Sequence, residues 1–350
     1  MDTCKNTSAK LLVRSVIRDD ENLNAYRIRI ALENGLDSPL WAFGRMGQTY
    51  ERCLESILRI SEVTGQPYDL LLSRSYIELI KHISHVSWFN HIVSSEMIRK
   101  SSPLCPICLE QGSMRCVWDL KLVVACPYHD CWLVDRCPSC KVPIRWDTMR
   151  SNQCRCGYLL ENFEFLEEAS PAAIAIAAIV EKSLGSVEEG LINKAKAIPE
   201  TFSDLPISIF TEFYNEFSFK SMSFKKVPFG LYPNAASKDF RFEMAASDYF
   251  GNQFLSWPKG VVDAYGGNIP NERRRYSGWR DFAKRLMKFP GVTHGLIADG
   301  LSLSTMLSFT TKHYALPENR ALTRSSNEDE TFRAIYNMLN KYRVQDVAWG

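Results

Sequence analysis

The sequence predicts a mainly α-helical protein in which helical domains of helix-turn-helix type flank a small cysteine-rich domain. Nine of the eleven cysteines fall between Cys105 and Cys156. The segments on both sides carry apolar residues at helical spacing. A chain of 350 residues is long enough for two or three domains. We expect these domains to cover residues 1–100, 101–161 and 162–350, with Ser101-Ser102-Pro103 at the first boundary.

Composition and charge narrow the functional classes. Hydrophobic residues make up 45% of the chain and charged residues 23%, as in a globular protein that buries a core. The net charge of +2 argues against a surface covered in phosphate-binding groups, although it leaves room for a local basic face. We find no apolar core of a secretory signal near the N-terminus, and no run of the roughly 18 apolar residues that a membrane-spanning helix needs. We therefore expect a cytoplasmic protein without a membrane partner. Disulfides are rare in the cytoplasm, so clustered cysteines there more often bind a metal or have a redox role.

The first hundred residues are expected to be helical. One helix is predicted from Asp20-Glu21 to the stop signal Asn34-Gly35. Another is expected to start at Ser38-Pro39, an N-cap followed by proline at the first helical position. A third is expected to end near Thr64-Gly65. Its amphipathic stripe consists of Tyr50, Cys53, Leu54, Ile57 and Leu58.

A short helix is expected at residues 66–71, directly after that third helix. The two helices are compatible with a helix-turn-helix unit and equally with a plain helical hairpin. Three histidines, His82, His85 and His91, are placed in the helical stretch that follows. The first two could bind a metal, but partly buried or surface histidines are the more ordinary interpretation.

The cysteine-rich segment contains paired ligands at the spacing of zinc half-sites. A Cys-x-x-Cys turn points two sulfurs at one place, and two such half-sites together form a tetrahedral zinc site. Chain order divides the ligands into two sets. The first set is Cys105, Cys108, Cys126 and His129, and the second is Cys137, Cys140, Cys154 and Cys156. The sequence therefore predicts a small ribbon or finger domain with two structural Zn²⁺ ions per chain and short strands at 116–118, 122–125 and 132–135.

Other cysteine chemistries fit this segment less well. A thioredoxin-like redox motif would be a single Cys-x-x-Cys beside a βαβ pattern. A catalytic zinc needs an open coordination position and usually an acid–base carboxylate, but no His-x-Glu precedes a Cys-x-x-Cys pair and no HExxH is present. Cys116 and Cys131 are left over. We expect them to be buried as small apolar side chains, although either could replace a proposed ligand.

The rest of the chain is predicted to be helical again. Helices are expected at residues 172–184, 207–217, 240–257 and 327–341, with Ile209, Phe210, Phe213 and Phe217 on the core face of the second. A second helix-turn-helix-like unit is expected within residues 291–309, although its serine-rich reading face predicts weak base readout.

The most basic stretch of the chain is either a solvated helix face or a contact for nucleic acid or an acidic partner. Its candidate contacts are Arg273, Arg274, Arg275, Lys284, Arg285 and Lys288.

Two motifs give the chain a resemblance to a known family. The opening DDENLNAYRIRIALENGL and the later CPICLEQGSMRCVWDLKLVVACPYHDCWLVDRCPSC resemble the TniQ family of transposition target-selection proteins, which includes the TnsD type. The C-terminal half is matched only loosely, through FLSWPKGV at 254–261 and the late helix-turn-helix. The matching positions are Asp20, Glu21, Leu23, Arg29, Ala31, Asn34 and Gly35 in the opening, and Cys105, Cys108, Trp118, Cys126, His129, Leu133, Cys137 and Cys140 in the middle.

The resemblance implies a non-enzymatic adapter in the transposition of bacterial Tn7-like elements. TniQ-type members link a target-recognition module to the AAA+ ATPase that recruits the transposase. In CRISPR-associated transposons that module is an RNA-guided complex such as Cascade, and the TniQ protein is a homodimer that could contact target DNA or guide RNA. TnsD-type members instead bind a DNA site directly. The length, the near-neutral charge and the weak reading helix favour the RNA-guided adapter, and a zinc-dependent nucleic-acid enzyme is the least favoured alternative.

Overall fold

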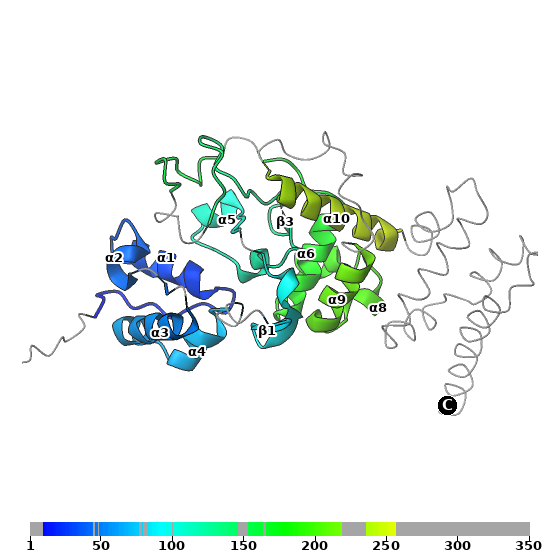
Figure 1. Ribbon diagram of the computed structural model, residues 1–350. Coiled ribbons are helices and arrows are strands. Elements are labelled where there is room, and N and C mark those ends of the chain that lie inside the picture. Colours follow the sequence, from blue (N-terminus) through cyan, green and yellow to red (C-terminus); the bar gives the residue numbers. More distant parts are fainter. Residues whose placement is uncertain are drawn as a thin grey trace, which may run out of the picture. The chain divides into compact units, whose positions relative to one another are not determined.

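The computed structural model describes residues 10–256, apart from short gaps at 45, 48, 77–78, 80–82, 100, 146–152, 164–165 and 219–235. About half of the described part is helical, and it also contains two small antiparallel sheets (Figure 1). Contacts divide the chain into two compact units, Met1–Ile198 with Pro206–Leu255, and Pro199–Leu205 with Ser256–Gly350. In the second unit, the described residues include α8 (Glu200–Ser203).

Four helices form the N-terminal part of the first unit: α1 (Leu23–Glu33), α2 (Pro39–Phe43), α3 (Tyr50–Thr64) and α4 (Tyr68–Ser73). The predicted cap at Ser38 is confirmed, because its side chain accepts a hydrogen bond from Leu40 N. The predicted stop at Gly65 is also confirmed. Its φ of 75° is a left-handed conformation that glycine adopts without strain.

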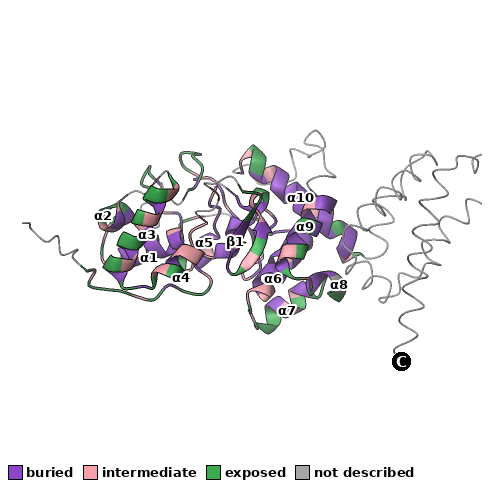
Figure 2. Cartoon of the chain, turned by 60° about the horizontal axis from the view of Figure 1, so that its bottom comes forward, coloured by how far each residue is buried: buried purple, intermediate pink, exposed green. Residues whose placement is uncertain are grey.

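The apolar faces of these four helices meet in one core, which appears as buried positions in Figure 2. Tyr26 and Ile30 of α1 contact this core, as do Ile57 and Ile60 of α3. The short connection between α3 and α4 is compatible with both arrangements expected from the sequence, so the helix-turn-helix interpretation stays a prediction. Within the described residues, no helix is long and apolar enough to cross a membrane.

The resemblance motif at the start of the chain has a structural role in this core. Arg29 donates to both carboxylate oxygens of Glu21, at 2.7 and 2.8 Å, and both side chains are buried. Asn34 is the C-cap of α1 and donates to Ile30 O at 2.8 Å. These motif residues therefore determine the geometry of α1.

A β-hairpin stands where the sequence predicted a helix with His85 and His91, so that prediction is wrong. β1 (His85–Trp88) pairs antiparallel with β2 (His91–Ser94). Phe89 and Asn90 between them both have positive φ, as a type I′ turn requires. Val86 and Trp88 alternate with more exposed residues, which is the period of a strand with one buried face. His82 lies outside the described residues.

The cysteine-rich segment has little regular structure. It contains α5 (Pro106–Glu110), the 3₁₀ helix η3 (Cys116–Asp119) and the two-residue strands β3 (Ala125–Cys126) and β4 (Cys131–Trp132). Another 3₁₀ helix, η2 (Ser95–Met97), lies just before it. The strand predicted at 116–118 is therefore wrong, because that run is the 3₁₀ helix. The strands predicted at 122–125 and 132–135 are present only in part, as β3, β4 and a bridge from Val134 to Leu104.

Helices return after this segment. Three of them confirm predictions, namely α6 (Pro171–Ser183), α9 (Ile207–Phe217) and α10 (Lys238–Leu255), whereas α7 (Glu189–Ala195) was not predicted. Rings from α9 and α10 pack together, with Phe210 edge-on to Phe250 at 6.0 Å between centroids. Phe213 and Phe217 are buried as predicted, but Ile209 is 37% exposed and lies outside this core. The basic stretch Arg273–Lys288, the second helix-turn-helix unit and the last predicted helix lie outside the described residues.

Candidate metal centres

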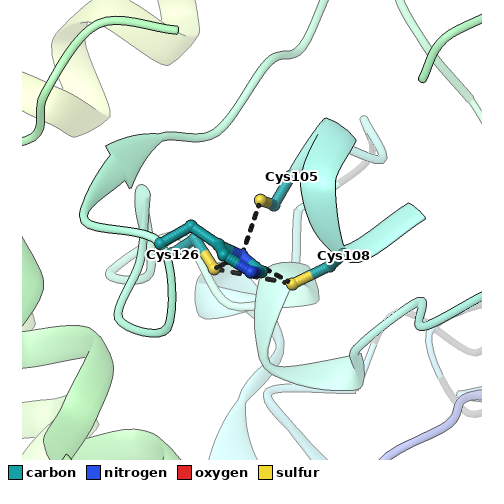
Figure 3. Close-up of side chains that lie close together, drawn as sticks. Cys105, Cys108 and Cys126 are labelled. Carbon is teal, nitrogen blue, oxygen red and sulfur yellow. Dashed lines mark hydrogen bonds between the residues drawn. The ribbon is translucent and has the colours of Figure 1, made fainter. Parts of the chain in front are cut away.

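The first predicted ligand set converges on one point. His129 Nδ1 lies 3.4 Å from Cys105 Sγ, 3.3 Å from Cys108 Sγ and 3.5 Å from Cys126 Sγ. The sulfurs of Cys108 and Cys126 are 3.6 Å apart. Figure 3 shows the three cysteines directed towards this point. The three cysteines are buried, whereas His129 is partly exposed.

Two short elements place these four side chains. Cys105 is the N-cap of α5 and Cys108 lies within it, so one helical turn brings both sulfurs to the same side. Cys126 lies in β3, and His129 lies in the turn between β3 and β4. Lys194 of α7 holds that turn through bonds of 2.6 Å to Pro127 O and to Asp130 Oδ1.

The spacing of the first set fits a tetrahedral zinc ion. Zinc–sulfur and zinc–nitrogen bonds of ordinary length give edges of roughly 3.8 Å between two sulfurs and roughly 3.6 Å between sulfur and nitrogen. The observed separations of 3.6 Å and of 3.3–3.5 Å lie within a few tenths of an ångström of these values. The set could therefore hold one metal ion, and its donor chemistry suits zinc.

The second predicted set also forms a cluster. Cys137 Sγ is 3.7 Å from Cys156 Sγ, and Cys140 Sγ is 3.5 Å from Cys154 Sγ. Ligand atoms within each of the two sets lie within 4.8 Å of one another. Gly157 follows the last pair with φ 89° and donates to Cys154 O at 2.8 Å, which closes the turn. This cluster lies nearer the surface, since Cys156 is exposed.

The thiols of the clusters influence one another. Hydrogen bonds from Cys108 and Cys126 lower the pKa of Cys105, and the bond to Cys105 raises the pKa of Cys108. In the second cluster, a backbone hydrogen bond from Tyr158 lowers the pKa of Cys156 to about 7. Adjacent thiolates repel one another, and a divalent cation bound between them offsets that repulsion.

A partly buried polar cluster joins the first metal set to the helices on both sides. Arg115 contacts Asp20 at 3.2 Å and Glu181 of α6 at 3.8 Å. It also donates to the Tyr128 hydroxyl at 3.0 Å, and its guanidinium lies 3.8 Å from the centre of that ring. Tyr128 is the residue before the ligand His129, so one arginine connects the metal turn to both neighbouring segments.

A buried ion pair ties the cysteine-rich segment to α10. Arg99 bonds Glu243 at 2.9 and 2.7 Å, and it also donates to Trp118 O at 2.5 Å and Val123 O at 3.1 Å. Sequence reasoning missed this pair and the cluster around Arg115. The one local signal was a charged residue on an apolar helix, such as Glu181 near the end of the Ala/Ile-rich α6.

The two clusters found in the described residues contain only cysteine and histidine. A hydrolytic zinc site usually adds an acid–base carboxylate beside an open coordination position. The clusters lack that feature, and their ligand sets have four donors each, as in closed structural sites. The predicted basic contacts are not among the described residues, so the structure leaves them as predictions.

Comparison with known proteins identifies one family. The TniQ family model matches residues 12–133, which include α1 to α4, the β1–β2 hairpin and the first ligand set. No curated protein matches the chain. A role in transposition target selection is what similarity to this family implies. The match to the TniQ family thus covers one segment of the chain, which holds its N-terminal helices and its first ligand set.

Proposed function

We propose that this protein is an adapter that links an RNA-guided Cascade-type complex to the AAA+ ATPase that regulates transposition. The match to the TniQ family over residues 12–133 carries this proposal. The net charge of +2 supports a protein that works mainly through protein contacts, because direct DNA binders usually carry a marked positive excess. The Cys/His composition of both clusters supports a structural rather than a hydrolytic role for the metals.

We further propose that each cluster binds one structural Zn²⁺. The first ion would be held by Cys105, Cys108, Cys126 and His129, and the second by Cys137, Cys140, Cys154 and Cys156. When bound, zinc supplies folding free energy to turns that have little core of their own. Arg115 and Arg99 join this part of the chain to α6 and α10, so ordering the turns would help to hold these helices in place.

Co-purification tests the adapter proposal. The tagged full chain would be expressed together with an RNA-guided Cascade-type complex and the AAA+ ATPase, and DNase would be added before purification. We expect the Cascade-type subunits, their guide RNA and the ATPase to be recovered with the chain. The control omits the guide RNA, and recovery of the Cascade-type complex is expected to fall. A solution mass of twice the chain's 40.0 kDa is expected for the homodimer that TniQ-type adapters form.

The TnsD-type alternative gives a different result in a footprinting experiment. A direct target selector would protect a defined DNA site without any guide RNA, and its affinity would fall steeply with salt. That outcome, together with no recovery of the Cascade-type complex, would overturn the adapter proposal.

A zinc enzyme would instead need an exchangeable metal with a bound water, whereas two tightly held ions per chain fit the structural role.

A further inference from the structure

A further cysteine lies beside the first cluster. Cys131 is buried, and its Sγ lies 3.7 Å from Cys105 Sγ. This separation matches the sulfur–sulfur edge of roughly 3.8 Å in a tetrahedral zinc site. Four other donors already complete that set, so Cys131 is an additional thiol. Its distance from Cys105 is the distance expected between two sulfur ligands of one metal ion.

The β3–β4 hairpin directs Cys131 towards the metal set. Cys126 and Cys131 are directly paired across the two strands. Directly paired residues of an antiparallel ribbon project from the same face, so the thiol of Cys131 lies on the face of the ligand Cys126. His129 lies in the turn that joins these strands, two positions before Cys131.

The backbone of Cys131 is fixed on both sides. β4 pairs with β3 on one side, and Cys131 forms a bridge with Glu168 on the other. The neighbouring Trp132 N donates to Glu167 O at 3.0 Å. His129, by contrast, is partly exposed at the turn and is the least buried of the four ligands. A side-chain rotation of Cys131 therefore needs little backbone movement, and water reaches His129 more readily than the three buried thiols.

We propose that Cys131 is a reserve ligand of the first metal site, which takes the place of His129 when the imidazole is lost or displaced. In this exchange the metal–nitrogen bond breaks, the Cys131 thiol releases its proton to water, and its sulfur forms a new metal–sulfur bond. The site changes from three sulfurs and one nitrogen to four sulfurs, and its net charge becomes one unit more negative. The inference rests on the metal occupancy proposed above and is independent of the role in transposition.

Cadmium NMR of the full chain tests this exchange, because the resonance of bound cadmium moves downfield as thiolate ligands replace nitrogen or oxygen. Protein loaded with an NMR-active cadmium isotope is expected to show two resonances, one for each cluster. In His129→Ala both are expected to remain, and the resonance of the first cluster is expected to move downfield, towards that of the all-cysteine second cluster. In the double variant His129→Ala/Cys131→Ala, the first resonance is expected to be lost or to move upfield.

Cys116→Ala in the His129→Ala background is the matched control, because Cys116 is a buried cysteine outside both clusters. It is expected to keep the downfield resonance. The inference is overturned if the first resonance moves upfield or disappears in His129→Ala, if the downfield resonance survives removal of Cys131, or if the control loses it. If the unmodified protein shows fewer than two resonances, the metal occupancy itself is wrong, which separates the two failures.

Discussion

The side chain of Asn22 connects the start of α1 to the cysteine-rich segment. Its Oδ1 accepts a 2.8 Å hydrogen bond from Ala25 N and so caps α1, while its Nδ2 donates a 2.5 Å hydrogen bond to Asp119 Oδ2. Asp119 also accepts a 3.0 Å bond from the Tyr76 hydroxyl. Asn22 and Asp119 are buried. The amide donates and accepts at the same time, whereas a carboxylate of the same shape can only accept, so the junction depends on asparagine rather than aspartate.

Asn22→Asp is expected to lower the free energy of unfolding by about 3 kcal/mol. The carboxylate keeps the helix cap, but it cannot donate to Asp119 and places a second negative charge against it. Denaturant unfolding of the metal-loaded protein, followed by tryptophan fluorescence, measures the change. Asn24→Asp is the control in the same helical turn, at a more exposed position, where we expect a change within about 0.5 kcal/mol. Equal effects of the two substitutions would contradict the role of Asn22.

Arg99→Met is expected to lower the free energy of unfolding by about 3–5 kcal/mol, because it leaves the buried carboxylate of Glu243 without its partner. Arg99→Met/Glu243→Leu is expected to lose less than the sum of the two single substitutions, since no unpaired charge then remains. A double-mutant cycle from denaturant unfolding gives the coupling energy. Additive effects would show that the two charges do not stabilise each other.

Gly251→Ala is expected to destabilise the packing of α10 on α6. A Cβ atom at position 251 would lie 2.2 Å from Ala172 Cβ, and overpacking of this kind costs about 1–3 kcal/mol. Adding Ala172→Gly is expected to restore part of the loss. Gly190→Ala in α7 is the control, because no atom lies within 4 Å of a Cβ there and the helix should become about 0.5–1 kcal/mol more stable. Thermal unfolding distinguishes the opposite signs.

Glu181 is expected to make stability fall as the pH rises from about 4.5 to 7. Burial raises the pKa of this carboxyl to about 7 although Arg115 lowers it, so in this range the folded state holds a proton that the unfolded chain has released. The shift corresponds to on the order of 3 kcal/mol, present at low pH and lost as the pH passes through the folded pKa. Comparison with Glu181→Gln across this range isolates the effect, since metal binding titrates in both proteins. Parallel stability curves for the two proteins would rule out this titration.

Chelation is expected to remove the two metals at different rates. The second cluster is nearer the surface and should release zinc first, whereas three of the four ligands of the first cluster are buried. A colorimetric chelator should therefore record two phases, and Cys137→Ala should lose the fast one. We expect that variant to misfold the turns of the second cluster rather than lose an activity. A folded Cys137→Ala protein with two zinc ions would contradict the second ligand set.

Several features were predictable because a few neighbouring residues decide them. The cap at Ser38 and the stop at Gly65 depend on local hydrogen bonds and on one backbone conformation. The two ligand sets follow from spacing, because Cys-x-x-Cys and Cys-x-Cys turns bring their sulfurs together whatever surrounds them. The sequence by itself therefore determined most of the helices, the composition of both clusters and the resemblance that the family match confirmed.

Only the tertiary structure decided the features that depend on distant contacts. The hairpin at His85–Ser94 was mistaken for a helix, because its buried face is defined by contacts with α9 rather than by a long periodic pattern. Arg99 and Glu243 lie 144 positions apart, so no local pattern could pair them. The approach of Cys131 to Cys105 likewise depends on how the β3–β4 hairpin packs against α5. Chain spacing predicts which donors share a turn, whereas packing of separate segments decides which further groups come within reach of them.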